Sequence, residues 1–268
     1  MQLKIATWNI NSVRLRINLI ERFLEEQAPD ILCLQEIKCV DDAFPTKALR
    51  KAGYEHLAIH GQKAYHGVAI ASRIPFTKIS RKSFCGKDDA RHISVDLDVP
   101  RGLQVHNFYV PAGGDEPDPE TNDKFAHKLA FLTEMAAWYR AHETKSDNRM
   151  VLVGDLNVAP LEEDVWSHKQ LLKVVSHTPI EVKHLADVTR SHDWIDVMRR
   201  FVPETEKLYS WWSYRARDWE TANRGRRLDH IWITPALENT VRSMQVIRQA
   251  RGWERSSDHA PVIASFEI

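Results

Sequence analysis

The sequence feature that most constrains the fold is a series of short apolar runs that recur along the whole chain. Short apolar runs bounded by turn residues are typical of buried β-strands. Between Gly53 and Val110 the runs follow one another without room for crossover helices, so the strands there are expected to pair antiparallel. We predict strands at Leu3–Trp8, Ile31–Leu34, Val68–Ala71, His92–Leu97, Leu103–Val110, Met150–Val153, Leu228–Thr234 and Pro261–Phe266.

Two segments between the strands show an apolar face at helical spacing and are expected to be core-facing helices. The first follows Ser12, which we expect to be its N-cap because a serine hydroxyl can accept a hydrogen bond from the first turn. Mixed sheets with helices outside fit this order of elements best, which places the chain in the α/β class. The apolar faces consist of Leu15, Leu19, Phe23 and Leu24, and of Phe125, Leu129, Leu132, Ala136 and Tyr139.

We expect residues 1–268 to form a single domain. The length exceeds that of most domains, but it suits one large α/β domain with a well-buried core. The sequence contains no internal repeat and no long linker. The segment Gly113–Asn122, rich in proline, glycine and acids, is expected to be a surface loop.

The composition predicts a soluble, cytoplasmic protein that does not associate with membranes. Cys33, Cys39 and Cys85 lack the paired spacing of zinc ligands, and their odd number argues against a disulfide framework. The sequence has no secretory signal pattern and no apolar run of membrane-spanning length. Basic and acidic residues balance at 37 each, but acids that hold a metal can cancel bases that hold phosphates, so neutrality does not exclude a nucleic-acid partner.

Polar side chains follow several of the predicted strands at the points where those strands end. Asn9 and Asn11 follow the first strand, Glu36 follows the second, and Asp155 and Asn157 follow a later one. Strand ends often carry sites in α/β proteins, because the scaffold is rigid there and side chains leave the core. One such residue alone more often marks a strand reaching the surface, so it is their combination that predicts a site.

Asp229 lies inside a predicted buried strand and therefore needs a partner. The strand period places it on the same face as Ile231 and Ile233, and a carboxylate at the edge of a buried face requires a hydrogen-bonding or cationic neighbour. His259, directly before the last predicted strand, could supply this contact. An isolated Asp258–His259 pair would more often be a turn in which the aspartate caps the backbone, but the other polar residues favour a site.

These residues and their order resemble the exonuclease III and abasic-site endonuclease family, within the superfamily that includes deoxyribonuclease I and the inositol polyphosphate phosphatases. The shared motifs cover nearly the whole chain. Two places depart from the family pattern: Ser12 stands where glycine is expected, and Leu161–Val182 has no clear match. The shared motifs are Thr7–Asn11, Leu34–Lys38, Gly61–Lys63 with His66–Ala69, Asn107–Pro111, Gly154–Asn157, Tyr209–Trp212, Arg227–Asp229 and Ser257–Pro261.

The resemblance implies a four-layer α/β sandwich of two mixed β-sheets flanked by helices, as in deoxyribonuclease I. It also implies a DNA-repair phosphodiesterase that incises duplex DNA 5′ to abasic sites and removes nucleotides or blocking groups from 3′ ends. The implied cofactor is Mg²⁺, for which Mn²⁺ could substitute. The implied partner is double-stranded DNA with abasic sites or 3′ ends, and we expect a monomer.

Hydrolysis of a phosphodiester requires an activated water, relief of charge on the phosphoryl oxygens and a stabilised leaving oxygen. Mg²⁺ prefers carboxylates, waters and phosphate oxygens, so Glu36 is the first expected ligand, with Asp258 and Asn9 beside it. The resemblance implies the same glutamate. It also implies that Asp155 positions and deprotonates the water and that Asn157 donates to a phosphate oxygen, and both are further candidate metal ligands.

Three more residues complete the expected catalytic group. His259 is expected to donate to a phosphate oxygen, while Asp229 accepts its other ring proton and fixes the orientation of the ring. Tyr109, matched by resemblance, is expected to place its hydroxyl near the phosphate. The alternative for Tyr109 is a strand aromatic with a satisfied hydroxyl.

The expected DNA contacts lie mainly in a basic and aromatic stretch, Tyr209–Arg227. Arginine binds phosphates, and flat rings stack on bases or line a pocket for a flipped sugar. The resemblance places Trp211 in such a pocket, next to Trp212 and Leu228. In the alternative, the tryptophans lie in the core and the arginines on a solvated loop. The stretch contains Trp211, Trp212, Tyr214 and Trp219 among Arg215, Arg217, Arg224, Arg226 and Arg227, and further substrate-binding candidates are Asn11, Arg14, Lys38, Lys63 and Arg91.

Two other functions stay open. The first is a phosphatase or phosphodiesterase of the same superfamily that acts on an inositol phosphate or a lipid headgroup. The sequence Arg226–Asp229 argues against it, because inositol phosphatases would carry a proline–tryptophan signature there. The second is an inactive nucleic-acid-binding module, which is disfavoured because every expected polar residue is present.

Overall fold

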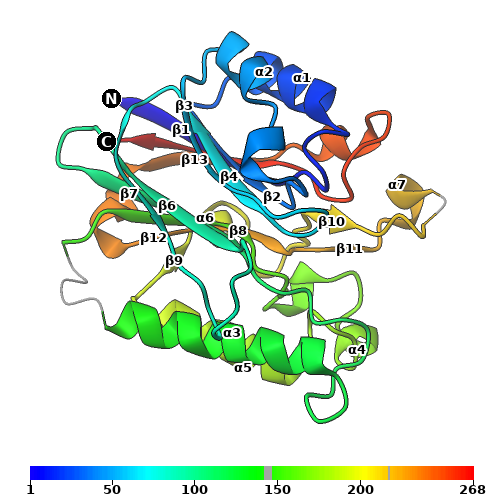
Figure 1. The fold of residues 1–268 in the computed structure, drawn as a ribbon. Helices are drawn as coiled ribbons and strands as arrows, with labels where there is room; N and C mark the ends of the chain where they lie inside the picture. Colours follow the sequence, from blue (N-terminus) through cyan, green and yellow to red (C-terminus); the bar gives the residue numbers. More distant parts are fainter. Residues whose placement is uncertain (142–146, 217) are drawn as a thin grey trace.

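A computed structural model describes residues 1–141, 147–216 and 218–268 of the chain. In this part of the chain, two six-stranded mixed sheets pack face to face and helices cover the outer side of each sheet (Figure 1). The predicted α/β class and the four-layer sandwich implied by the resemblance are therefore confirmed.

The first sheet has the strand order β13-β14-β1-β2-β4-β3. Strands β1 and β2 are parallel, and the other neighbours are antiparallel. The first and last of these strands along the chain, β1 and β14, are neighbours, so the two termini lie side by side (Figure 1). The strands span Gln2–Asn9 (β1), Ile31–Gln35 (β2), His56–His60 (β3), Val68–Ser72 (β4), Val241–Val246 (β13) and Val262–Glu267 (β14).

The second sheet has the strand order β5-β6-β7-β8-β12-β9, in which only β7 and β8 are parallel. As predicted, the strand pairs formed within Gly53–Val110 are antiparallel. The strands span Phe76–Arg81 (β5), His92–Leu97 (β6), Leu103–Tyr109 (β7), Met150–Asp155 (β8), Ile195–Asp196 (β9) and Asp229–Ile233 (β12). A separate two-stranded arm pairs Trp211–Trp212 (β10) with Gly225–Arg226 (β11).

All of the strands predicted from apolar runs are present, but β3, β5, β9 and β13 and the short arm strands β10 and β11 were not predicted. The first four lie at the edges of their sheets and are only partly buried. Edge strands face solvent on one side, so their sequences alternate with polar residues and lack a continuous apolar run.

Helices α1 (Ile17–Gln27) and α2 (Thr46–Lys51) cover the first sheet, and α3 (Asp123–Arg140) and α5 (Pro179–Ser191) cover the second (Figure 1). The shorter helices are α4 (His168–Leu171), α6 (Val197–Phe201) and α7 (Trp219–Ala222). Short 3₁₀ turns occupy Asp41–Ala43, Glu162–Asp164, Pro235–Thr240 and Arg248–Gly252.

The apolar face predicted for α3 is confirmed, whereas the start predicted for the first helix is wrong. Helix α1 begins at Ile17, and its N-cap Arg16 makes no side-chain cap hydrogen bond, so Ser12 does not cap it. Leu15 therefore precedes the helix and is 76 % exposed, although it was expected on the buried face. Phe23 and Leu24 lie on the buried face as predicted, together with Ile20, and Leu19 is partly buried beside them.

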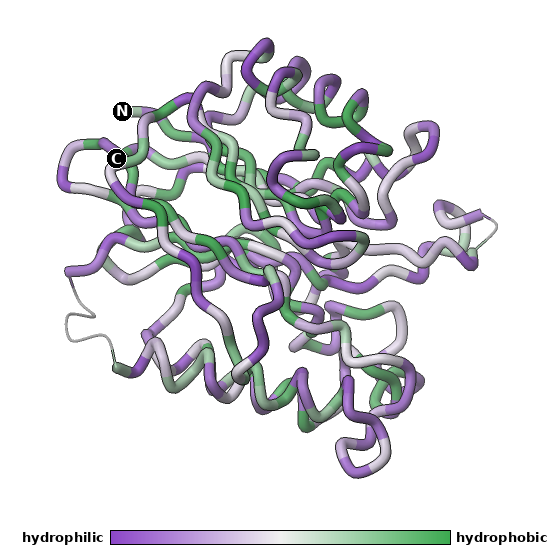
Figure 2. Tube along the Cα trace, viewed as in Figure 1, coloured by the Kyte–Doolittle hydropathy of each residue, from purple (hydrophilic) through white to green (hydrophobic). Residues whose placement is uncertain are grey.

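Three apolar layers hold the sandwich together. Residues such as Ile5 and Val153 pack between the two sheets, Trp8 and Phe23 pack under α1, and Phe131 packs under α3. Figure 2 shows the hydrophobic segments concentrated along the central strands. Each large apolar side chain that is fully buried stabilises the fold by about 1.5–3 kcal/mol. None of the described helices combines the length and the apolar character needed to cross a membrane.

Candidate active site

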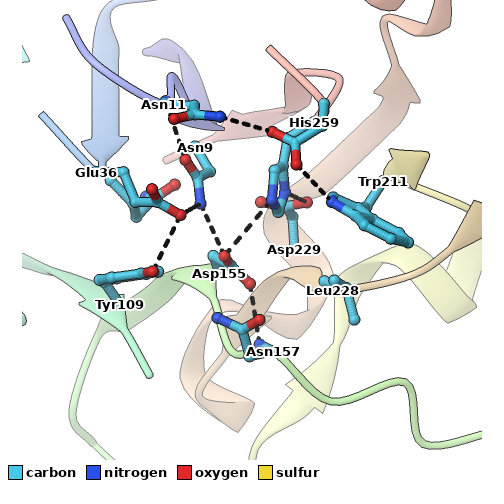
Figure 3. A network of polar contacts seen from close by, with 12 residues as sticks. Asn9, Asn11, Glu36, Tyr109, Asp155, Asn157, Trp211, Leu228, Asp229 and His259 are labelled. Carbon is cyan, nitrogen blue, oxygen red and sulfur yellow. Dashed lines mark hydrogen bonds and ion pairs between the residues drawn. The ribbon is translucent and has the colours of Figure 1, made fainter. Parts of the chain in front are cut away.

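Polar side chains predicted from separate parts of the sequence meet at one end of the sandwich (Figure 3). Strands β1 and β2 are parallel, so Asn9 and Glu36 emerge at the same edge of the first sheet. In the second sheet, Tyr109 pairs with Asp155 at the ends of the parallel strands β7 and β8. Asp155 also pairs with Asp229 at the start of the antiparallel strand β12. The carboxyl ends of parallel strands share one edge, and stacking of the sheets brings the two edges together.

His259 precedes β14, and its ring lies between two carboxylates. Nδ1 is 2.8 Å from Oδ2 of Asp229, and Nε2 is 3.7 Å from Oδ2 of Asp155. Burial disfavours the imidazolium, but the charges of Asp229 and then of Asp155 outweigh burial and raise the pKa of His259 to about 10. The predicted contact of Asp229 with His259 is therefore present, and the ring is protonated at neutral pH.

Asp155 is almost completely buried, with 1 % of its surface exposed. Burial raises the pKa of Asp155 to about 7, while the charge of His259 opposes this rise and the charge of Asp229 adds to it. Its carboxylate accepts hydrogen bonds from Asn9 Nδ2 at 2.8 Å and from the backbone N–H of Asn157 at 3.0 Å. A pKa near neutrality suits a group that accepts a proton during catalysis.

The carboxylate of Glu36 is bound by three donors. Oε1 accepts from Asn9 Nδ2 at 2.9 Å and from the Tyr109 hydroxyl at 3.0 Å, and Oε2 lies 2.8 Å from Lys38 Nζ. Burial opposes ionisation of Glu36, but the charge of Lys38 and the hydrogen bonds from Asn9 and Lys38 hold its pKa below the usual value. Burial, followed by the charge of Glu36, raises the pKa of Tyr109 well above its usual value, so the phenol remains a donor.

Asp258 accepts hydrogen bonds with both of its oxygens. Asn11 Nδ2 donates to Oδ1 at 3.2 Å, and Trp211 Nε1 donates to Oδ2 at 2.9 Å. Lys38 Nζ reaches Oδ1 of Asn11 at 2.6 Å and thereby connects this group to Glu36. Three residues that were expected to bind substrate, Asn11, Lys38 and Trp211, therefore contact the expected metal ligands Asp258 and Glu36.

Left-handed backbone recurs in the site. Asn11, Glu36 and Asn157 have φ values of 48°, 49° and 55°. Residues other than glycine seldom adopt this region, which costs of order 1–3 kcal/mol for each residue and is concentrated at functional sites. Ser12 also has a positive φ, 85°, which explains why glycine is expected at this position. Its N–H donates to the carbonyl of Glu36 at 2.7 Å, so the turn forms with serine in place.

The side of the site around Glu36 fits a hard divalent cation, because such ions prefer oxygen ligands. The carboxylate and amide oxygens on this side belong to Asn9, Asn11, Glu36 and Asp258. In the described part of the chain, Asp155, Asp229 and His259 also bring potential ligand atoms within 4.8 Å of one another. In this second group the His259 ring lies between the carboxylates of Asp229 and Asp155, an arrangement that suits proton handling.

A cleft of about 610 Å³ opens beside these residues. Trp166, Trp211 and Leu228 form an apolar wall of the cleft and pack in one cluster. The guanidinium of Arg226 lies 5.2 Å from the centre of the Trp211 ring, which is close enough for a cation–π interaction. Trp212 also lines the cleft, but it is only 2 % exposed, so most of its ring belongs to the core.

Some of the basic residues expected to contact DNA are exposed, and others are buried. Arg14, Lys63, Arg215 and Arg224 are exposed, and the last two line the cleft. Arg217 lies outside the described residues. Arg91 is 6 % exposed, pairs with a neighbouring aspartate and packs over the ring of Tyr109 at 5.0 Å, so little of it faces solvent.

Arg227 was expected in the basic footprint, and this expectation is wrong. Its side chain is 0 % exposed, and its guanidinium binds Asp164 at 2.6 Å and 2.9 Å and Asp196 at 2.6 Å. The two carboxylates outweigh burial and hold the pKa of Arg227 above its usual value. Arg227 therefore ties β12 to its neighbours and cannot reach a phosphate.

Three residues near the site were not predicted. Trp166 and Ser176 line the cleft but belong to the segment Leu161–Val182, which matched no motif. Lys128 is buried and donates to the carbonyl of Asn157 at 2.8 Å. A signal existed for Lys128 alone: it stands three residues after Phe125 and four before Leu132, on the apolar face of the predicted helix.

The chain is similar in sequence and in fold to known nucleases. The profile of the Endonuclease/Exonuclease/phosphatase family matches residues 6–259. Exodeoxyribonuclease III of Haemophilus influenzae is 33% identical, and the alignment covers 99% of this chain and 100% of that protein.

Two solved structures have the same fold. An AP endonuclease from Archaeoglobus fulgidus superposes with a TM-score of 0.90 at 30% identity. A 3′-5′ exonuclease from Neisseria meningitidis superposes with a TM-score of 0.89, also at 30% identity. Both alignments cover 99% of this chain and 100% of the other chain.

Proposed function

The chain belongs to the Endonuclease/Exonuclease/phosphatase family, and we propose that it is a DNA-repair phosphodiesterase similar to exodeoxyribonuclease III and the AP endonucleases. It is a hydrolase of phosphodiester bonds that incises duplex DNA 5′ to abasic sites and removes nucleotides or blocking groups from 3′ ends.

The observation that carries this proposal is the position of His259 between Asp229 and Asp155, next to the carboxylate of Glu36. Phosphodiester hydrolysis requires a proton acceptor, a cationic donor and an anionic metal ligand within one site. The cluster contains one group of each kind, and a cleft large enough for a nucleotide sugar adjoins it.

In the proposed mechanism, Asp155 positions a water and accepts its proton, for which a pKa of about 7 is suitable. His259 donates its Nε2–H to a phosphoryl oxygen, while Asp229 holds Nδ1–H and stabilises the charge of the ring. Asn157 donates a side-chain N–H to a second phosphoryl oxygen. Tyr109 keeps its proton and orients Glu36.

Glu36, with Asn9 and Asp258 beside it, would hold the divalent cation. Mg²⁺ is our choice for this ion, and Mn²⁺ is a possible substitute. Asp155 and Asn157 are further candidate ligands. When bound, the cation supplies positive charge to the phosphoryl oxygens and to the leaving 3′ oxygen. The contacts that keep Glu36 ionised support this assignment.

The proposed substrate is double-stranded DNA with abasic sites or 3′ ends. Trp211 and Leu228 form an apolar wall that suits a sugar without a base, and Arg215 and Arg224 are exposed at the same cleft for phosphates. We propose that residues 1–268 act as one domain, because one apolar layer joins the two sheets, and that the protein is a monomer. The three free cysteines suit the reducing cytoplasm.

The experiment that tests the proposal is a gel assay with magnesium on three substrates. These are a duplex with one abasic site, an otherwise identical intact duplex, and inositol phosphates, for which phosphate release is measured. We expect incision on the 5′ side of the abasic site. Phosphate release from inositol phosphates without DNA incision would favour the superfamily phosphatase, and DNA binding without any cleavage would indicate an inactive binding module.

A further inference from the structure

Lys128 is a fully buried lysine on the apolar face of α3. Its ammonium donates to the carbonyl oxygens of Asn157 at 2.8 Å and of Ala112 at 3.2 Å, and it pairs with the carboxylate of Glu181. Lys128 and Glu181 are both 0 % exposed. Because an isolated charge is strongly disfavoured in a protein interior, the ammonium stays charged only through these acceptors.

Glu181 connects this ion pair to the wall of the cleft. Its oxygens accept the backbone N–H of Ser176 at 2.9 Å and of Thr178 at 3.1 Å. Ser176 lines the cleft, and its hydroxyl accepts a hydrogen bond from Arg226 at 2.7 Å. One buried ion pair therefore joins the loop of Asn157 to the unmatched segment that forms one side of the cleft.

Asn157 has a φ of 55°, in the left-handed region that asparagine tolerates better than most residues, and several contacts hold this conformation in place. Its N–H donates to Asp155 at 3.0 Å, and its side-chain Nδ2 donates to the carbonyl of Val110 at 2.9 Å. These two contacts come from the ends of β8 and β7. The contact from Lys128 to the Asn157 carbonyl comes from a third element, helix α3.

We propose that Lys128, neutralised by Glu181, is a positioning residue that holds the backbone of Asn157 so that its side chain meets the scissile phosphate. The ion pair does not touch the substrate, and it acts by fixing the carbonyl of Asn157 against α3. A displacement of about 1 Å in a catalytic group can lower a rate by about 100-fold, so loss of this contact affects chemistry more than substrate binding. This inference rests on the proposed function.

The test removes both charges together, since removing one would leave the other buried alone. Lys128→Met with Glu181→Gln keeps the length of both side chains. Single-turnover rates on the duplex with one abasic site are measured at saturating magnesium for the wild type, this pair variant, Asn157→Ala and the combined triple variant. We expect the pair variant to be about 10- to 100-fold slower than the wild type.

The triple variant decides between a positioning role and a merely structural role. If the pair acts through Asn157, the triple variant is no slower than Asn157→Ala alone. If the rate loss of the pair variant and the rate loss of Asn157→Ala multiply in the triple variant, the proposal is wrong. Tyr139→Leu is the control for general destabilisation, because Tyr139 is a buried residue of the same helix three turns from Lys128. It should lower the melting temperature without a matching loss of rate, and an equal loss of rate in this control would contradict the proposal.

A second variant keeps the test decisive if the pair variant lacks the circular dichroism of the wild type. Lys128→Arg keeps the cation but shifts its donors. Its rate is compared with the rates of the wild type, of Asn157→Ala and of the variant that combines both substitutions. If Lys128→Arg lowers the single-turnover rate of the wild type but not that of Asn157→Ala, the proposal is supported. If it lowers both rates, the proposal is overturned. A wild-type protein that does not cut the abasic duplex would instead reject the proposed function.

Discussion

His259 Nδ1 lies 2.8 Å from Oδ2 of Asp229, and both side chains are buried. The two residues stand 30 positions apart: Asp229 begins β12 of the second sheet, and His259 lies just before β14 of the first sheet. Because a neighbouring carboxylate favours the imidazolium, the titration of His259 reports directly on this contact.

Asp229→Asn should lower the pKa of His259 from about 10, because the carboxylate that outweighs burial is lost. The alkaline loss of activity should then move to lower pH. The raised pKa also means that this ionisation stabilises the wild type most fully below about pH 6.5 and that the contribution is lost as the pH rises through about 10. The stability deficit of the variant should therefore be largest in acid and shrink toward pH 10. An NMR titration of His259 in metal-free protein checks the pairing, which an unchanged pKa would reject.

Glu36→Gln should keep the fold but raise the magnesium concentration needed for half-maximal activity, because a neutral amide oxygen replaces a carboxylate ligand. Glu25→Gln, which removes an exposed acid on α1, is the matched control and should leave the magnesium titration unchanged. If the two variants give the same magnesium curve as the wild type, Glu36 does not hold the metal.

Trp211→Ala should reduce the preference for an abasic duplex over an intact internal phosphate, because the apolar wall formed with Leu228 loses its ring. Flipping an intact base costs a few kcal/mol and costs less where stacking is already lost, so the pocket selects the substrate before chemistry. Because Trp211 also donates to Asp258, the rates are measured at saturating magnesium. Rates on both duplexes are compared after circular dichroism has shown an intact fold. A ratio equal to that of the wild type would mean that Trp211 acts only as a packing residue.

Arg227→Met should destabilise the protein by about 1–3 kcal/mol, because Asp164 keeps only Arg199 as a cationic partner and the partly exposed Asp196 loses its ion pair with Arg227. Arg224→Met, on the same stretch but exposed, should change the free energy of unfolding by no more than about 0.5 kcal/mol and should weaken DNA binding instead. Urea unfolding and DNA-binding titrations separate the two effects. Equal free energies of unfolding for the two variants would show that the ion pairs of Arg227 contribute little to stability.

Much of the fold and site was predictable because the signals are local. An apolar run marks a buried strand wherever it lies, and Asn9, Glu36 and Asp155 stand one or two residues after such runs. The need of Asp229 for a partner likewise followed from strand periodicity. Edge strands such as β5 escaped prediction because solvent on one side removes the apolar run.

The sequence by itself determined the central strands, the helix α3 and the polar residues that could form a phosphodiesterase site. Only the tertiary structure decided how each charged side chain is used. Arg224 and Arg227 belong to the same basic stretch, and nothing in the sequence distinguishes their roles. In the structure, Arg227 is buried against Asp164, 63 positions away. Lys128 meets Glu181 53 positions away and the carbonyl of Asn157 29 positions away. The physical reason is that the free energy of a charge depends on its solvation and on its partners, and both are set by whichever distant segments pack against it.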